Sequence, residues 1–178
     1  MAHQQCGHVR VKIGKYPTHR FYHNWLYNWF GYSQQQRTSI KIHKYDTWSM
    51  DDTLAPIILP MLVQLKATKH GAPMVDMKDV PKELRATKKE LTVYSKGGDA
   101  DTKHFERWDW ILNEMVWAFE QKCRDNWEDD YYGDYVEDKD RPLGGRFEWI
   151  DVEGRKAHQE RMSNGFKLFG KYFENLWD

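Results

Sequence analysis

The sequence predicts a single α/β or α+β domain over residues 1–178, in which a small sheet, including two early strands, is packed by three to four helices. Two short stretches near the N-terminus alternate apolar and polar side chains, as half-buried strands do. Later segments repeat apolar residues at the three-four spacing of helices. A chain of 178 residues can build one complete core but is short for two.

Two octapeptides, VKIGKYPT at 11–18 and IKIHKYDT at 40–47, are nearly the same. Each combines the end of a predicted strand with a helix start, which predicts the order β-α-β-α. If the strands are parallel neighbours, both strand ends and both helix N-termini lie at one sheet edge, where anionic ligands bind. The residues expected at this edge are Lys15, Tyr16, Lys44, Tyr45 and Trp48. The alternative is a chance match between two β-rich segments.

The helix after each strand has recognisable end signals. The first is expected between Thr18, a capping residue, and Gly31, a stop residue. Its expected buried stripe is Tyr22, Trp25, Leu26 and Trp29. The second helix is expected to start between Asp46 and Asp52 and to end at Lys69, with a kink or tightened first half because it contains prolines.

The rest of the chain alternates loops with two long helices. Loops are expected at about 72–100, with one short helical turn, and at about 128–145, followed by a strand at 147–152. The clearest helix runs over 101–127, with the apolar stripe Phe105, Trp108, Leu112, Met115, Phe119 and Cys123. The last helix is expected over 154–177, with Met162, Phe166, Phe169, Phe173 and Leu176 or Trp177 inward. Gly165 and Gly170 inside it indicate close packing or a break.

Two tryptophans fall opposite the stripe of the clearest helix. At about 100° per residue, Trp110 and Trp117 share a face with polar residues. Either a second layer packs on this face, which we favour, or the face borders a binding site or a subunit contact.

Composition and charge suggest a binding surface. Aromatic residues make up 15% of the chain, more than a core of this size usually needs, so some are expected at a surface. Residues 1–45 contain no Asp or Glu, and their cations are Arg10, Lys12, Lys15, Arg20, Arg37, Lys41 and Lys44. Residues 125–140 show the reverse, with eight Asp or Glu residues and Lys139 as the sole cation. This segregation favours an anionic partner for residues 1–45, or pairing of the two segments within the fold or across a dimer.

Signatures of catalysis are weak. His19 and His23 have a metal-chelating spacing but no third ligand is evident. Four carboxylates on one helix, Glu106, Asp109, Glu114 and Glu120, resemble those of metal-dependent nucleotide pyrophosphohydrolases, but a second carboxylate helix is missing. Motifs for phosphate-binding loops, dinucleotide binding or serine nucleophiles do not occur. We therefore predict no metal and no cofactor, and we lean against an enzyme.

Three word-like blocks carry a resemblance: KYDTWSMDDTLAPIILPMLVQLKATKHGAP, RWDWILNEMVWAFEQK and EGRKAHQERMSNGFKLFGKYFENLWD. They resemble a family of uncharacterised proteins encoded by tailed bacteriophages, including marine phages, over most of the chain after about residue 9. The family has no established activity, so the resemblance transfers no catalytic residue. It implies a phage accessory protein in the cytoplasm of an infected bacterium or associated with a virion.

The sequence as a whole favours a non-catalytic protein that binds an anionic aromatic ligand, either a nucleotide or a nucleic-acid segment. One alternative is a protein-interaction or structural module that forms a homo-oligomer or contacts a host protein. The other is a metal-dependent phosphoester hydrolase. No membrane contact is expected, because the longest mainly apolar run, Leu54–Leu65, is too short to span a bilayer.

Overall fold

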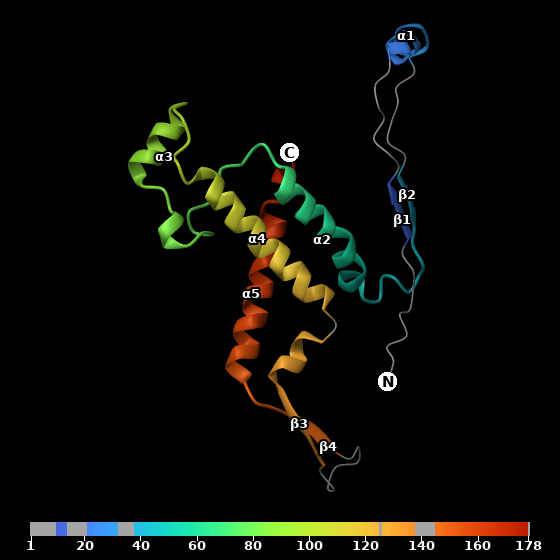
Figure 1. The fold of residues 1–178 in the computed structure, drawn as a ribbon, viewed down its shortest axis with the longest axis vertical. Coiled ribbons are helices and arrows are strands. Elements are labelled where there is room, and N and C mark those ends of the chain that lie inside the picture. The colour runs from blue at the N-terminus through green and yellow to red at the C-terminus, as the bar shows by residue number, and fades with distance from the viewer. Residues whose placement is uncertain (1–9, 14–20, 32–37, 125, 138–144, 178) are drawn as a thin grey trace. The chain divides into compact units, whose positions relative to one another are not determined.

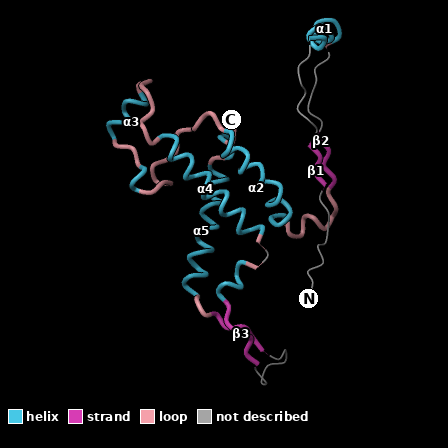
Figure 2. Tube along the Cα trace, viewed as in Figure 1, coloured by secondary structure: helices cyan, strands magenta, loops and turns pink. Residues whose placement is uncertain are grey.

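A computed structural model describes residues 10–13, 21–31, 38–124, 126–137 and 145–177. The described elements are five α-helices, short 3-10 turns and two pairs of strands, so the chain is a small α+β protein (Figures 1 and 2). The strands form two separate two-stranded antiparallel sheets rather than one sheet. The chain groups into two compact units, Met1–Thr53 and Leu54–Asp178, called unit 1 and unit 2 below. The single domain stays a prediction.

Unit 1 pairs the two early strands in the direction opposite to the one expected. β1 (Arg10–Ile13) and β2 (Thr38–Lys41) are antiparallel, with Arg10 opposite Lys41 and Ile13 opposite Thr38. The prediction of parallel neighbours was therefore wrong. Alternation of apolar and polar residues determines which side chains share a face, but it carries no information about strand direction. Ile13 and Lys41, the last residues of the two strands, lie at opposite ends of the ladder.

Helix α1 (Phe21–Phe30) lies between these strands in the sequence and ends as expected. Gly31 has a φ of 63°, and its N–H donates to the carbonyl of Tyr27 at 2.9 Å, a glycine C-cap. Thr18, the expected cap at the other end, lies outside the described residues. The expected buried stripe was wrong, because Trp25 and Trp29 are exposed and His23 is the buried residue of the helix.

Helix α2 (Met50–Thr68) continues through Pro56 and Pro60 and carries Asp51 and Asp52 in its first turn. Acidic residues there complement the helix dipole. Ala55 and Leu62 on this helix enter the core of unit 2.

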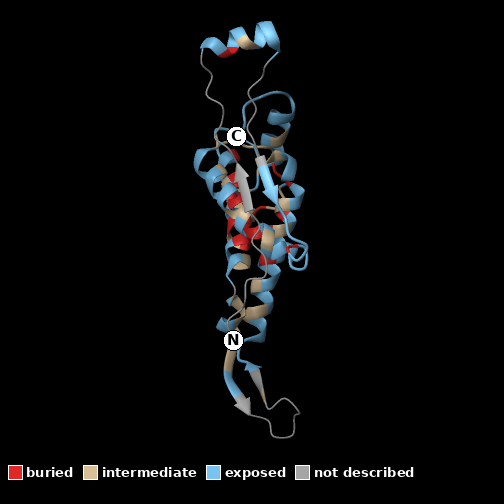
Figure 3. Cartoon of the chain, turned by 90° about the vertical axis from the view of Figure 1, so that its right-hand side faces the viewer, coloured by how far each residue is buried: buried red, intermediate tan, exposed pale blue. Residues whose placement is uncertain are grey.

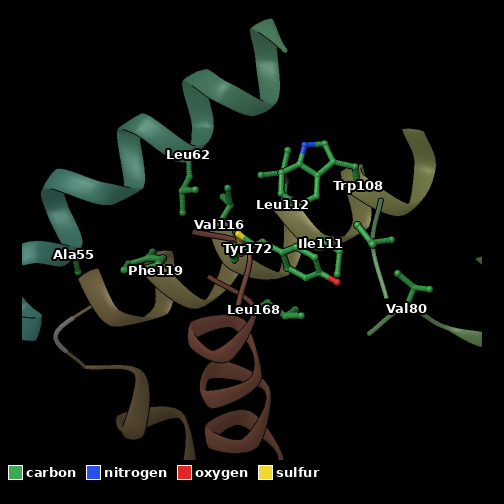
Figure 4. Close-up of a cluster of buried hydrophobic side chains, with 12 residues drawn as sticks. Ala55, Leu62, Val80, Trp108, Ile111, Leu112, Val116, Phe119, Leu168 and Tyr172 are labelled. Carbon is green, nitrogen blue, oxygen red and sulfur yellow. The ribbon is translucent and has the colours of Figure 1, made fainter. Parts of the chain in front are cut away.

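The core of unit 2 is built around α4 (His104–Cys123). Figure 4 shows side chains of α2, α4, α5 (Val152–Lys171) and the segment near Val80 meeting in one cluster. Of the predicted stripe on α4, four residues are buried: Trp108, Leu112, Met115 and Phe119. Phe105 and Cys123, at its two ends, are exposed. Figure 3 shows that buried residues concentrate in these helices.

The second layer expected against α4 is present. Trp110 is half-buried and packs against the core, and the ring of Trp117 lies 4.9 Å from the ring of His158 on α5. Gly165 explains how α5 approaches so closely. A Cβ there would lie 2.4 Å from the Cβ of Ala118 and 2.6 Å from the carbonyl oxygen of Glu114, so only glycine fits without a shift. Helix α5 runs through Gly165 and Gly170 without a break.

The inward set predicted for the last helix is partly right. Met162 is buried, and Phe166, Phe169 and Leu176 are half-buried against the core. Phe173, in the 3-10 turn η3 (Phe173–Asn175), and Trp177 are exposed, and both lie beyond the end of the helix at Lys171.

The two segments expected to be loops contain regular structure. Residues 72–100 include η1 (Lys82–Leu84) and α3 (Lys88–Ser95), where Thr87 and Glu90 form a capping box. The acidic segment holds η2 (Trp127–Tyr131) and β3 (Tyr132–Glu137), which pairs with β4 (Gly145–Trp149). The strand predicted at 147–152 therefore exists but both begins and ends earlier, at Gly145 and Trp149.

Candidate functional site

Three of the five residues predicted to bind a ligand lie in one turn of unit 1. Lys44, Tyr45 and Trp48 belong to the turn at 43–49 that connects β2 to α2. Lys15 and Tyr16 lie outside the described residues. The shared edge proposed for all five rested on parallel strands, and antiparallel pairing removes that geometric reason. The turn at 43–49 is therefore considered on its own.

The turn is held by its own hydrogen bonds. Asp46, which is only 4% exposed, accepts a bond from the backbone N–H of His43 at 2.5 Å. The N–H of Asp46 donates to the carbonyl of His43 at 2.9 Å, and the N–H of Trp48 donates to that of Tyr45 at 3.1 Å. The hydroxyl of Thr53 donates to the carbonyl of Asp46 at 3.0 Å. Aspartate suits this place because its short carboxylate reaches a nearby backbone N–H.

The turn that Asp46 stabilises exposes the cation of Lys44 and the rings of Tyr45 and Trp48 to solvent. Lys44 Nζ lies 5.0 Å from the centroid of the Tyr45 ring, within the range of a cation–π contact. Tyr45 is 52% exposed and Trp48 is 88% exposed. The ring of His43 lies 5.2 Å from that of Tyr45. Open rings beside an ammonium group can stack on a planar molecule while the cation binds its anionic group.

Helix α1 presents a second exposed aromatic surface. Its exposed rings are Phe21, Tyr22, Trp25, Tyr27, Trp29 and Phe30. The rings of Trp25 and Trp29 are 6.1 Å apart and tilted by 32°, and Phe30 meets Trp25 edge-on at 5.9 Å. The helix contains no Lys, Arg, Asp or Glu. We call the rings of α1 and the turn at 43–49 the aromatic surfaces of unit 1.

The α1 surface was missed at the sequence level because its spacing is that of a buried helix face. No clear signal in the sequence marks this exposure, because residues 1–53 contain other apolar residues, such as Val11, Ile13 and Ile40, that could have covered the face. Among residues 21–31 and 39–53 of unit 1, whose burial the structure describes, the buried ones are His23 and Asp46, and both are polar. A three-four repeat of apolar residues indicates an apolar helix face. It does not indicate whether that face packs against the same chain, packs against another molecule or is exposed.

The carboxylates of α4 that were considered for a metal site do not form one. Asp109 forms an ion pair with Lys69 at 2.5 Å. Glu114, which is buried, accepts two bonds from Arg161, at 3.0 Å from Nε and 2.7 Å from Nη2, and this pairing raises the pKa of Arg161. Glu106 and Glu120 are exposed. Within the described ranges, no group of three or more His, Cys, Asp or Glu residues is placed to hold a metal ion.

Comparison of the chain with protein-family models, curated proteins and solved structures finds no match. The resemblance to phage proteins therefore stays a prediction. Of the helices in the described part of the chain, none combines the length and apolar character needed to cross a membrane.

Proposed function

We propose that the protein is a non-catalytic binding protein whose unit 1 holds a single-stranded nucleic-acid segment. The observation that carries the proposal is the exposure of the rings of α1, Tyr45 and Trp48 in a stretch, residues 1–45 and the turn that follows, that has many cations and almost no acids. Base stacking on aromatic rings tolerates any sequence, and lysine and arginine neutralise phosphate. Both features are needed for binding without base-specific contacts.

The distribution of charge favours nucleic acid over a lipid surface. Helices that lie in a membrane interface usually carry Lys and Arg on their polar face. The polar residues of α1 are instead His23, Asn24 and Asn28. Cations occur in the strands and the turn, where Lys41 ends β2 and Lys44 lies next to the exposed ring of Tyr45. Cations close to exposed rings suit a strand in which each base is linked to a phosphate.

Self-association through the acidic segment is less well supported. Arg124 pairs with Asp130 through two bonds of 2.7 Å, and Arg155 lies 3.2 Å from Glu128. These acids of η2 are therefore already matched by cations of unit 2. The hydrolase alternative is weakened by the ion pairs of Asp109 and Glu114. We further propose, from the resemblance alone, that the protein acts as a phage accessory protein in the cytoplasm of the infected bacterium or in the virion.

The test is fluorescence anisotropy with labelled single strands of about 12 nucleotides, DNA and RNA, titrated at low and moderate salt. The variants are Lys44→Ala with Trp48→Ala, and Trp25→Ala with Trp29→Ala. The matched control changes one exposed cation and one exposed ring of unit 2, Lys156→Ala with Phe173→Ala.

Loss of a stacked ring should cost about 1–3 kcal/mol of binding free energy, a roughly 5- to 150-fold weaker Kd. We expect the logarithm of affinity to fall with the logarithm of salt by about 0.7 per phosphate neutralised. The control should bind like the unchanged protein. The proposal is overturned if neither strand binds at low salt, or if both unit 1 variants bind unchanged. Binding to anionic vesicles with no binding to either strand also rejects it, as does ring-dependent dimerisation in light scattering without strand binding.

A further inference from the structure

A pocket of about 590 Å³ opens in unit 2, among residues 76–81, α4 and α5. Its lining residues are Asp76, Lys78, Asp79, Val80, Pro81, Trp110, Asn164, Lys167 and Lys171. The volume falls within the roughly 300–1,000 Å³ typical of small-molecule sites. The pocket belongs to unit 2 alone and shares no residue with the aromatic surfaces of unit 1.

The two carboxylates of the pocket are already neutralised by the protein. Lys171 Nζ donates to Asp76 Oδ2 at 3.1 Å and also to Asp79. The hydroxyl of Tyr172 donates to Asp79 Oδ2 at 2.7 Å and accepts from the N–H of Asp76 at 2.9 Å. Hydrogen bonds, first from the backbone of Lys78 and then from Lys171, hold the pKa of Asp76 below its ordinary value. Both aspartates therefore stay ionised and serve as partners of Lys171 and Tyr172.

The same network argues against acid–base catalysis in the pocket. The hydrogen bond to Asp79 raises the pKa of Lys171, so its ammonium group keeps its proton. Burial first, and then the bond to Asp79, raise the pKa of Tyr172 to about 12. A group suited to proton transfer has a pKa near the working pH, and neither of these groups does. The network therefore holds the pocket wall in place, and we consider the pocket as a binding site rather than a catalytic one.

The remaining polar groups of the pocket are exposed to solvent and can still form hydrogen bonds or ion pairs with a ligand. The ammonium groups of Lys78 and Lys167 have no hydrogen bond or ion pair within the part of the chain that the structure describes, and both residues are exposed. Asn164 adds an amide, and Trp110 adds a half-buried ring. Three lysines against two aspartates leave the lining with an excess of one positive charge. Lys171 is held by both aspartates, so Lys78 and Lys167 carry the charge left for a ligand, although the charge of Lys78 also acts on Asp76.

We propose that this pocket binds a small molecule that carries a phosphate group and a planar ring, of the nucleoside monophosphate class. Lys78 and Lys167 would hold the phosphate, Trp110 would contact the ring, and Asn164 would bond to ring or ribose atoms. An anion is favoured over a cation, because the carboxylates that would hold a cation are bonded to Lys171. Trp110 packs against the core of unit 2 and also borders the pocket, so its ring can contact a ligand there.

Isothermal titration calorimetry with AMP, adenosine, ribose 5-phosphate and inorganic phosphate tests the proposal. Lys78→Glu and Lys167→Glu reverse the charge of the free cations and, because both residues are exposed, should leave the fold intact. Lys156→Glu is the matched control, because Lys156 lies on α5, as Lys167 does, but outside the pocket. Trp110→Leu removes the ring while keeping apolar volume, and its circular dichroism and urea midpoint show whether it is folded.

We expect AMP to bind at least about tenfold more tightly than adenosine or inorganic phosphate, and each pocket charge reversal to weaken AMP by a similar factor. Lys156→Glu should change the affinity little. The proposal is overturned if AMP gives no heat up to about 5 mM, if both pocket reversals bind AMP unchanged, or if phosphate binds as tightly as AMP. Trp48→Ala separates the two proposals: it should weaken strand binding and leave AMP binding unchanged, whereas loss of AMP binding in this variant would reject the pocket.

Discussion

Unit 1 and unit 2 use the same kinds of side chain for opposite purposes. In unit 2, Trp108 is fully buried and packs edge-on against Tyr172 at 5.7 Å. In unit 1, Trp29 is 72% exposed and Trp48 is 88% exposed. Among the residues whose burial the structure describes, every buried apolar residue lies at or beyond Ala55. The high aromatic content therefore divides into rings that are buried in a core and rings that are exposed, and only coordinates separate the two groups.

The largest expected effect on stability comes from the buried ring. Trp108→Ala removes a side chain that is fully inside the cluster of Figure 4 and leaves a cavity between α4 and its neighbours. Such a change typically costs about 3–5 kcal/mol of the free energy of unfolding. Urea unfolding followed by far-UV circular dichroism measures it. A loss under about 1 kcal/mol would mean that Trp108 is not a core residue, and the contrast with unit 1 would fail.

A smaller and more local effect is expected where α5 crosses α4. Gly165→Ala would place its Cβ against Ala118 and the carbonyl of Glu114, and overpacking of this kind typically costs about 1–3 kcal/mol. Gly170→Ala is the matched control on the same helix, since its Cβ would meet nothing within 4 Å. That change should stabilise by up to about 1 kcal/mol, because alanine favours helix. Equal urea midpoints for the two variants would contradict the close approach at Gly165.

Much of unit 2 follows from the sequence, because one chain supplies both sides of its core. Trp108, Leu112 and Met115 repeat at helical spacing and are buried as expected, and Gly165 marks a real close approach. The exposed ends of the α4 stripe, Phe105 and Cys123, show where neighbouring elements stop.

Unit 1 was harder to predict for two physical reasons. A strand pattern has a period but no direction, so the antiparallel pairing of β1 and β2 could not be read from it. A helical stripe indicates apolar surface but not what covers it, so α1 was assigned a buried face, whereas Trp25 and Trp29 are exposed among the residues that the structure describes. The turn residues Lys44, Tyr45 and Trp48 do lie together, because they are close in sequence.

Unit 2 should also lose stability in mild acid through His158. Its ring stacks on Trp127 at 4.6 Å, Tyr131 Oη lies 2.9 Å from its Nδ1, and its Nε2 is buried without a partner in the described residues. Burial lowers the pKa of His158, with Arg124 and Arg161 acting in the same direction and Asp130 against it. The folded state thus binds this proton less readily than the unfolded state does.

The sign follows from proton linkage. Between the lowered pKa of folded His158 and its unfolded value, the unfolded chain binds more protons, so stability rises with pH and is lost as pH falls below about 6.5. One such group contributes at most about 1.4 kcal/mol per pH unit. Urea unfolding at intervals from about pH 7 to about pH 5 measures the slope. His158→Gln should flatten the dependence of stability on pH. An unchanged slope would show that a group other than His158 takes up the proton.

The smallest expected effect on stability sharpens the comparison most, because it pairs two residues of one type. Trp29→Ala removes an exposed ring with few neighbours, so the free energy of unfolding should change by under about 0.5 kcal/mol, against several for Trp108→Ala. The same variant should bind single strands more weakly, since the ring is available for stacking. Urea unfolding and fluorescence anisotropy on one preparation measure the free energy of unfolding and the affinity for single strands. A large loss of stability would show that α1 is covered by another part of the protein, and its rings would then be core residues like those of unit 2.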